Sequence, residues 1–266
     1  MVQELQIGGT GVAGAVTILA ADGLSIAFGG VRAIDGVSLA VEPGTVFSII
    51  GPNGAGKTTL LNIVSGLYRP QAGRVLLAGE DVTAVAAHRL ARLGLSRTFQ
   101  NLQIFFRMST LDNVMVGRHR HERTGLVADL LHLPRVARQN RATRDAALAA
   151  LARVGLAADA ERSAGALAYG ALKRLEIARA LASEPKILLL DEPAAGCTPV
   201  ERREIESVIR TIVRDGVTVV LVEHDMRLVM TVSDRIHVLA HGRTLAEGNA
   251  AEIREHPAVI EAYLGT

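Results

Sequence analysis

The stretch that decides the fold is Gly51-Pro52-Asn53-Gly54-Ala55-Gly56-Lys57-Thr58-Thr59. It follows an apolar, β-branched run at residues 46–50 and leads into residues 60–64, whose apolar side chains have helical spacing. The three glycines permit positive φ and leave room for an anion against the backbone, so that successive N–H groups can point at phosphate oxygens. A helix N-terminus behind the loop adds its dipole. The order of strand, glycine-rich loop and helix therefore predicts a phosphate-binding loop rather than a chance glycine-rich turn.

Two side chains of this loop predict the chemistry of its ligand. Lys57 is expected to reach the outer phosphates of a nucleoside triphosphate, and the Thr58 hydroxyl is expected to ligate Mg²⁺. We therefore expect a nucleoside triphosphate and Mg²⁺ to be bound, with all nine residues of the stretch in contact with the nucleotide.

Composition limits the class of protein. The chain has 266 residues, 49% of them hydrophobic and 21% charged, which is enough apolar material for a sizeable core and argues against disorder. The formal net charge is only +2, so no nucleic-acid partner is expected. The single cysteine, Cys197, excludes an intrachain disulfide and fits a reducing compartment.

No targeting or membrane-spanning segment is evident in the sequence. No apolar run approaches the roughly 20 residues that a transmembrane helix needs. The apolar run at residues 12–21 lacks a preceding positive region, so it does not resemble an export signal. Any connection to a membrane is therefore expected to run through a partner protein.

The first part of the chain predicts an antiparallel β subdomain around the loop. Residues 1–17 are small and Gly-rich and are expected to form a poorly ordered tail, with a single nucleotide-binding domain over 18–266. Short alternating segments at 24–28 and 37–41 are accompanied by the turn signals Gly29-Gly30 and Asp35-Gly36, and a further strand is expected at 74–78.

The remainder predicts a helical insertion and an α/β core. Ala, Leu and Arg with helical spacing dominate residues 84–168, which predicts an inserted helical subdomain. A helix at 171–183 and continuous apolar strands at 187–190 and 217–222 indicate a parallel sheet covered on both faces. A strand pair and a helix are expected in 236–266, so the predicted class is an α/β P-loop NTPase.

Two carboxylates follow the apolar strand at 187–190. Asp191 lies at the carboxyl edge where ligands of parallel sheets bind, and is expected to hold the Mg²⁺ shell. Glu192 points elsewhere and is expected to polarise the attacking water. In isolation the pair could simply end a buried strand, but an upstream phosphate loop favours the catalytic interpretation.

Five elements in this order resemble the nucleotide-binding subunit of an ABC transporter. They are the phosphate loop, Arg97-Thr98-Phe99-Gln100-Asn101, Leu167-Ala168-Tyr169-Gly170, the strand with Asp191-Glu192 at its end, and Glu223-His224-Asp225. The resemblance runs from about residue 19 to the end. Longer motifs, including Asn113-Val114-Met115-Val116-Gly117 and Asp191-Glu192-Pro193-Ala194-Ala195-Gly196, are similar to the larger ATPase subunit of branched-chain (hydrophobic) amino-acid importers.

The resemblance implies further roles. Gln100 corresponds to the residue that senses Mg²⁺ and water, His224 to the switch histidine on the γ-phosphate, and Phe28 to the aromatic that stacks on adenine, with a core Phe as its alternative. Two ATPase chains, identical or paralogous, are expected to face each other head to tail. The signature residues Ala168, Tyr169 and Gly170 of one chain would then contact the nucleotide of the other.

The implied function is ATP hydrolysis that powers solute import, with branched-chain amino acids as the substrate class. Integral membrane permease subunits, and indirectly a substrate-binding protein, are the expected partners, and the chain is expected to lie peripherally on the cytoplasmic face of the cell membrane. The alternatives are an importer of another small solute and a soluble ABC-type ATPase that acts on nucleic acid or ribosomes. The latter class usually carries tandem ATPase units or a long insertion, which this sequence lacks.

The sequence departs from the usual signature Leu-Ser-Gly-Gly-Gln, where it has Leu167-Ala168-Tyr169-Gly170-Ala171, and from the usual D-loop that follows Asp191-Glu192. Ala168 cannot supply a hydroxyl donor, so the opposing γ-phosphate would rely on the Gly170 N–H and the helix dipole. Ala171-Leu172-Lys173 also departs from the branched-chain subfamily, which puts the contact between the two chains in question. Thr198 stands where most relatives carry Asp or Asn.

Two clusters are interpreted as solvated surface. His119, His121 and His132 suggest a metal site, but histidines two residues apart among arginines favour an exposed face. The arginines at 135, 138, 141 and 144 are likewise assigned to a solvated helical face.

Overall fold

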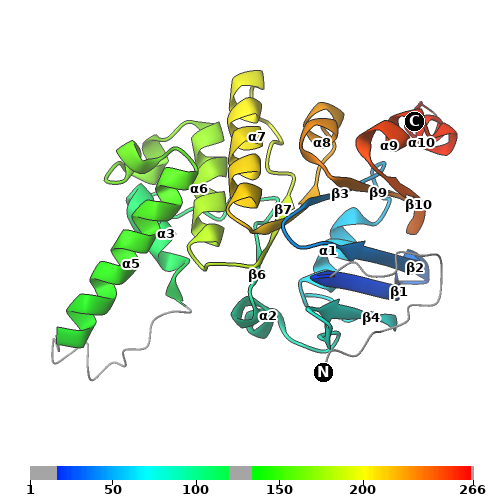
Figure 1. The fold of residues 1–266 in the computed structure, drawn as a ribbon, viewed down its shortest axis with the longest axis horizontal. Helices are drawn as coiled ribbons and strands as arrows, with labels where there is room; N and C mark the ends of the chain where they lie inside the picture. Colours follow the sequence, from blue (N-terminus) through cyan, green and yellow to red (C-terminus); the bar gives the residue numbers. More distant parts are fainter. Residues whose placement is uncertain (1–16, 120–133, 265–266) are drawn as a thin grey trace.

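A computed structural model describes residues 17–119 and 134–264 and confirms the α/β class (Figure 1). The predicted tail at 1–17 falls almost wholly outside this part of the chain, as do His121 and His132, and the side chain of Arg135 is also outside it.

An antiparallel sheet lies beside the phosphate loop, as predicted. Its strand order is β2-β1-β4-β5, with β1 at Leu19–Phe28, β2 at Val31–Val41, β4 at Ala72–Leu77 and β5 at Glu80–Asp81. Gly29-Gly30 forms the turn between β1 and β2. Asp35-Gly36 was wrongly predicted as a turn, since it lies inside β2, where the register with β1 shifts. A glycine within a strand marks a bulge as readily as a hairpin.

The core sheet has the order β10-β9-β3-β8-β7-β6, in which every pairing except that of β10 with β9 is parallel. Its strands are β3 (Val46–Ile50), β6 (Leu95–Arg97), β7 (Ile187–Asp191), β8 (Thr218–Val222), β9 (Arg235–Ala240) and β10 (Arg243–Gly248). The predicted C-terminal strand pair is therefore an extension of the core sheet. Two short helices follow it, α9 (Ala250–Glu255) and α10 (Pro257–Leu264).

Strand β6 corrects the predicted boundary of the helical segment. It lies within 84–168, directly after α2 (Ala87–Leu93), yet it pairs with β7 in the core sheet. A three-residue strand is too short for a periodic signal and stands among Ala, Leu and Arg. Its position carries Arg97 to the strand ends described below.

Alternate residues of the parallel strands enter two separate cores. Ile187 and Leu189 of β7 pack with α1 (Lys57–Val64) and the antiparallel sheet. Leu188 and Leu190 pack instead in the core that contains residues of α6 (Tyr169–Leu181) and α7 (Pro199–Arg214). Because both faces are covered, the strands read as continuous apolar runs. The helices α7 (Pro199–Arg214) and α8 (Met226–Val232) follow β7 and β8.

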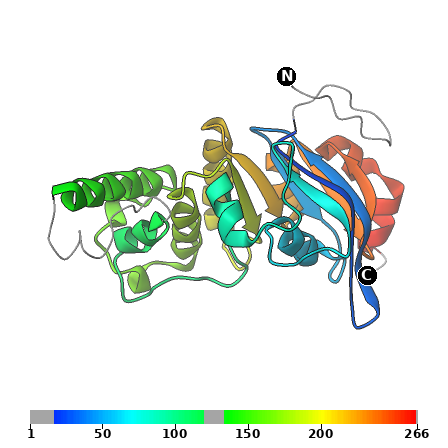
Figure 2. The same ribbon diagram turned by 90° about the horizontal axis from the view of Figure 1, so that it is seen from below.

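The remaining helices form a separate helical lobe, which we define as α3, α5 and α6. These helices are α3 (Thr110–Val116), α5 (Pro134–Arg153) and α6 (Tyr169–Leu181), with 3₁₀ turns η2 (Ala157–Asp159) and η3 (Ala164–Ala166) before α6. They contact one another, and α6 also packs on α7. Figures 1 and 2 show this lobe at one end of the molecule and the antiparallel sheet at the other.

Candidate nucleotide-binding site

The glycine-rich loop joins β3 to α1 and has the predicted backbone geometry. Gly51, Gly54 and Gly56 have φ of 151°, 79° and 103°. A Cβ at Gly51 would collide with the carbonyl oxygen of Leu239, and one at Gly56 would lie 2.5 Å from the carbonyl oxygen of Ala33. Gly54 has open space at the same position. Two of the three glycines are thus required by neighbouring strands, and only Gly54 faces a clear region.

The loop presents an uncapped helix N-terminus. The residue at the N-cap of α1 is Gly56, which makes no side-chain cap, and no acidic residue lies in the first turn. The first amides of a helix lack intrahelical partners, so this end favours an anion. Within the loop Ala55 is buried, Pro52 and Thr59 are half-buried, and Asn53 and Thr58 are exposed.

Lys57 lies inside the loop. Its Nζ donates to the carbonyl oxygens of Gly51 at 2.6 Å and Pro52 at 2.9 Å. Burial lowers the pKa of this ammonium group, while the carboxylates of Glu192 and Asp191 act in the opposite direction. The ammonium is therefore held against the backbone that would receive phosphate oxygens.

Asp191 ends β7 and pairs with a residue that the sequence analysis quoted in a motif but did not place in the site. Arg97 Nη2 donates to Asp191 Oδ2 at 2.9 Å, and both side chains are buried. Burial raises the pKa of the Asp191 carboxyl despite the opposing effect of the guanidinium. Arg97 Nη1 also donates to Asn62 Oδ1 and Ser65 Oγ, so it ties β7 to α1. Its place in Arg97-Thr98-Phe99-Gln100 was the available signal.

The structure brings Glu192, Gln100 and His224 together. Gln100 Nε2 donates to Glu192 Oε2 at 3.1 Å, and His224 Nδ1 lies 3.9 Å from Glu192 Oε1. Glu192 has a φ of 49°, which is uncommon for a residue with a side chain. The three side chains come from the segments that follow β6, β7 and β8, so the adjacent parallel strands assemble them at one sheet edge.

Glu223 is a second residue that the sequence analysis did not assign to the site. Its carboxylate is fully buried and accepts hydrogen bonds from the amides of Ala194 at 2.8 Å and His224 at 3.0 Å. It thereby connects the segment after Glu192 with the segment that carries His224. A charged residue at the end of an apolar strand, next to a predicted site histidine, was the signal.

Phe28 is exposed at the end of β1. Its relative exposure of 47% argues against the alternative of a core phenylalanine. Its ring makes an edge contact with Tyr68, with 5.4 Å between ring centroids. Tyr68 is also exposed, and it extends the aromatic surface beyond the single residue that was predicted.

The signature residues are not part of this cluster. Ala168 is the N-cap of α6, and Tyr169 and Gly170 are its first two residues. Figure 1 places α6 in the helical lobe and α1 between the sheets, and no hydrogen bond among the described residues joins residues 168–170 to the phosphate loop. The amide of Gly170 donates instead to Glu201 Oε1 at 2.9 Å. Within one chain, the two predicted halves of a nucleotide site are separate.

The structure shows what three of the departing residues contact. Leu172 packs in the apolar core of the helical lobe, whereas Lys173 is buried with its Nζ 3.4 Å from the Gln100 carbonyl oxygen and 5.9 Å from the centre of the Tyr169 ring. Thr198 is the N-cap of α7 and forms a capping box with Glu201. Thr performs this role as Asp or Asn does.

The described members of the two clusters assigned to surface have exposed side chains. Arg138, Arg141 and Arg144 are exposed, and Arg144 pairs with Glu161. Over residues 17–119 and 134–264, no group of three or more His, Cys, Asp or Glu side chains is arranged to hold a metal ion.

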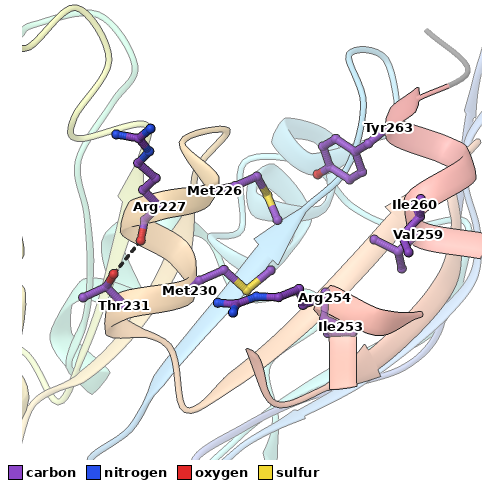
Figure 3. A pocket seen from close by; sticks show the side chains of 9 residues that line it. All are labelled: Met226, Arg227, Met230, Thr231, Ile253, Arg254, Val259, Ile260 and Tyr263. Atoms are coloured by element: carbon purple, nitrogen blue, oxygen red, sulfur yellow. Dashed lines mark hydrogen bonds between the residues drawn. The ribbon is translucent and has the colours of Figure 1, made fainter. Parts of the chain in front are cut away.

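A cavity of about 660 Å³ lies away from the predicted chemistry. It is formed between α8 and the C-terminal helices by residues that include Met226, Met230, Arg254 and Tyr263 (Figure 3). None of the predicted site residues lines it.

The fold and the loop define a nucleotide-binding protein of the P-loop class. Residues 34–195 match the family model described as ABC transporter, and residues 243–266 match that of the branched-chain amino acid ATP-binding cassette transporter. The chain belongs to the ABC transporter family. BraF of Pseudomonas aeruginosa, a high-affinity branched-chain amino acid transport ATP-binding protein, is 46% identical over 93% of this chain and 98% of its own length.

Solved structures agree with this assignment. A nucleotide-free ATP-binding cassette from an ABC transporter has a TM-score of 0.82 at 31% identity and covers 94% of this chain and 100% of its own. A bacterial ABC transporter cassette solved as a dimer has a TM-score of 0.73 at 25% identity, over 87% of this chain and 98% of its own. The predicted family and fold are confirmed.

Proposed function

We propose that this chain is the ATP-hydrolysing subunit of an importer for branched-chain amino acids. The observation that carries the proposal is the cluster of Gln100, Glu192 and His224 at the edge of the parallel sheet, beside a phosphate loop with Lys57 buried in it. The similarity to BraF and the C-terminal family match support the substrate class. No described residue is assigned to the amino acid itself.

The side chains divide the chemistry of hydrolysis among them. Lys57 and the first amides of α1 bind and neutralise the β- and γ-phosphates, since both present positive charge at the same edge. Glu192 accepts a proton from water, and Gln100 fixes the orientation of its carboxylate through the 3.1 Å hydrogen bond. His224, whose side chain is 61% exposed and lies 3.9 Å from Glu192, contacts the γ-phosphate.

The residues present fit a magnesium ion that arrives with the nucleotide. Mg²⁺ prefers oxygen ligands and is often bound by one or two protein groups together with phosphates and water. Thr58 presents an exposed hydroxyl, and the Oδ1 atom of Asp191 has no protein hydrogen-bond partner in the described part of the chain. Thr58, Gln100 and Asp191 would hold the ion, which supplies charge neutralisation at the phosphates.

A second cassette completes the site. We propose that two chains face each other head to tail, so that residues 168–170 of one meet the nucleotide on the phosphate loop of the other. The separation of these segments within one chain and the solved dimeric cassette support this arrangement. Phe28 stacks on the adenine in the same complex.

Permease subunits are the proposed membrane partners, with a substrate-binding protein on the opposite side. Three phenylalanines close to Gln100 in the sequence, Phe99, Phe105 and Phe106, are each 44% to 51% exposed. Exposed aromatic groups of this kind mark protein contact surfaces.

In the described residues no helix combines the length and apolar character needed to cross a bilayer. We propose peripheral attachment at the cytoplasmic face through these partners, and one ATPase domain over 18–266 with the helical lobe as its moving part.

The test is ATP turnover of the full chain with Glu192 replaced by Gln. Loss of water activation should lower turnover by about 10²-fold or more while ATP binding persists. Glu206→Gln on α7, which removes a carboxylate paired only with Arg210, is the matched control. Unchanged turnover in Glu192→Gln would contradict the assigned mechanism. ATP-dependent uptake of leucine, and not of an unrelated solute, into vesicles with the cognate permease tests the substrate class.

A further inference from the structure

The carboxylate of Glu201 lies between the N-termini of two helices. Its Oε1 accepts the Gly170 amide at 2.9 Å, at the start of α6. Its Oε2 accepts the amide of Thr198 at 2.8 Å and the Thr198 hydroxyl at 2.9 Å, at the start of α7. Oε1 therefore caps the signature helix α6, and Oε2 caps α7, the helix that carries Glu201 itself.

This carboxylate is an anion at neutral pH. Hydrogen bonds from the amides of Thr198 and Gly170 lower the pKa of Glu201, and Arg174 acts in the same direction. Negative charge at a helix N-terminus is stabilised by the unpaired amides and by the helix dipole. Glu201 thus supplies α6 with the cap that Ala168 cannot provide.

The carboxylate also occupies the space beside Gly170. Gly170 is buried, and a Cβ added to it would lie 2.5 Å from Glu201 Cγ and 2.6 Å from Oε1. Under the proposed function, the γ-phosphate held by a second copy of the chain is bound by this same amide. One N–H group cannot bind both anions fully, and two negative groups at one helix end repel each other.

We propose that Glu201 is a positioning residue that competes with the nucleotide of the second chain for the Gly170 amide. This inference rests on the proposed function, because the competition exists only if the site forms between two chains. Closure then requires Oε1 to leave Gly170, while Oε2 keeps α7 capped through Thr198. Glu201 therefore sets the ATP concentration at which two chains associate.

The experiment measures ATP-driven dimer formation of the full chain by sedimentation velocity, with Mg²⁺ present and Glu192→Gln in every sample to prevent turnover. Replacing Glu201 by Gln or Ala removes the competing charge. Both variants should reach half-maximal dimer at roughly threefold to tenfold lower ATP than the parent, since a charge-assisted hydrogen bond no longer has to be exchanged. Unfolding temperature without nucleotide should fall in both, because the cap of α6 is weakened.

Two controls separate competition from simple capping. Glu204→Gln removes another α7 carboxylate that faces α6, through Arg174 at 3.3 Å, without touching Gly170, and should leave the ATP requirement unchanged. Thr198→Ala weakens the α7 cap while the Gly170 amide keeps Glu201 as its partner, so this variant should not lower the ATP concentration needed for half-maximal dimer. An equal or higher ATP requirement in the Glu201 variants overturns the inference and leaves the proposed function standing. Absence of an ATP-dependent dimer in the parent overturns the shared site, and the inference with it.

Discussion

The N-termini of α1 and α6, which the proposed site uses, differ in whether a side chain of the same chain caps them. At α1 the N-cap is Gly56, no side chain caps the helix, and the nearest charge is the ammonium of Lys57. At α6 the N-cap is Ala168, which is equally unable to cap, yet Glu201 reaches across from α7 and binds the Gly170 amide. One terminus is prepared for an anion, whereas the other already holds one.

This difference means that binding an anion has a different energetic cost at each of the two helix N-termini. A terminus that is left open and flanked by a cation binds its ligand without giving up any internal contact. A terminus that is capped internally must exchange one anion for another, so its affinity depends on the contact that is lost. Under the proposed function, the N-terminus of α1 is suited to holding nucleotide on a single chain. The N-terminus of α6 is suited to controlling the ATP concentration at which two chains associate.

The largest expected effect comes from removing the cation of the open half. Lys57→Ala should reduce ATP turnover by about 10²–10³-fold, because the charge that neutralises the phosphates is lost. Lys186, an exposed lysine directly before β7, provides the control, and Lys186→Ala should keep full turnover. Steady-state phosphate release measures both. Equal turnover in Lys57→Ala and the parent would show that this half does not act through its cation.

The open half also depends on the buried ion pair beneath it. Arg97→Met removes the cation that is hydrogen-bonded to the buried Asp191 and should lower the free energy of unfolding by about 3–5 kcal/mol. Adding Asp191→Asn removes the stranded charge and should restore part of that loss. Urea denaturation of the two variants measures it. A double variant less stable than Arg97→Met alone would mean that Asp191 has another partner.

The two halves of the proposed site should respond differently when a glycine in each, Gly170 or Gly54, is replaced by alanine, because only Gly170 is crowded by another side chain. Gly170→Ala places a Cβ 2.5 Å from Glu201 and should cost about 1–3 kcal/mol of stability through overpacking. Glu201→Ala should relieve most of this cost, which a double-mutant cycle in urea detects. Gly54→Ala meets nothing within 4 Å, so its penalty, due to φ of 79° alone, should be unaffected by Glu201→Ala. Additive effects at Gly170 and Glu201 would contradict the described contact.

The smallest expected effect is on pH dependence. The folded-state pKa of Glu201 lies below its ordinary value of 4.5, so its contribution to stability is complete above that value and is lost as pH falls through the lower one. Glu201→Gln should therefore be less stable than the parent at pH 7, with the difference shrinking toward about pH 3. Urea titrations at the two pH values measure this, and a difference that grows on acidification would contradict the lowered pKa.

The parts of the fold that could be predicted had strong local signals. The apolar runs of β7 and β8 and the glycine-rich loop specified a parallel sheet with a phosphate-binding edge, since both faces of each strand are buried. Strand β6 could not be predicted because its three residues pair with a strand 92 positions later in the chain (Leu95 with Ile187). Asp35-Gly36 was misassigned because a bulge and a turn use the same residues.

The site shows the same division. Glu192 was identified from its position after an apolar strand, and Gln100 and His224 from the resemblance to ABC transporter subunits. In the structure all three follow parallel strands, which bring such residues to one edge. Arg97, Glu223 and Tyr68 were missed as site residues because their roles are contacts with other side chains or amides, across 94 positions in the case of Arg97 and Asp191. The assigned roles of the predicted residues stay predictions until the variants above are measured.

The sequence by itself determined that a nucleotide-binding loop follows β3, that carboxylates end β7, and that the signature lacks its hydroxyl at Ala168. These features depend on neighbours along the chain, through backbone conformation and periodic burial. Only the tertiary structure decided that Gly51 and Gly56 are glycine because Leu239 and Ala33 approach them, and that Glu201 supplies the missing cap of α6. Both facts arise from segments distant in sequence that pack within hydrogen-bonding distance, which no local pattern records.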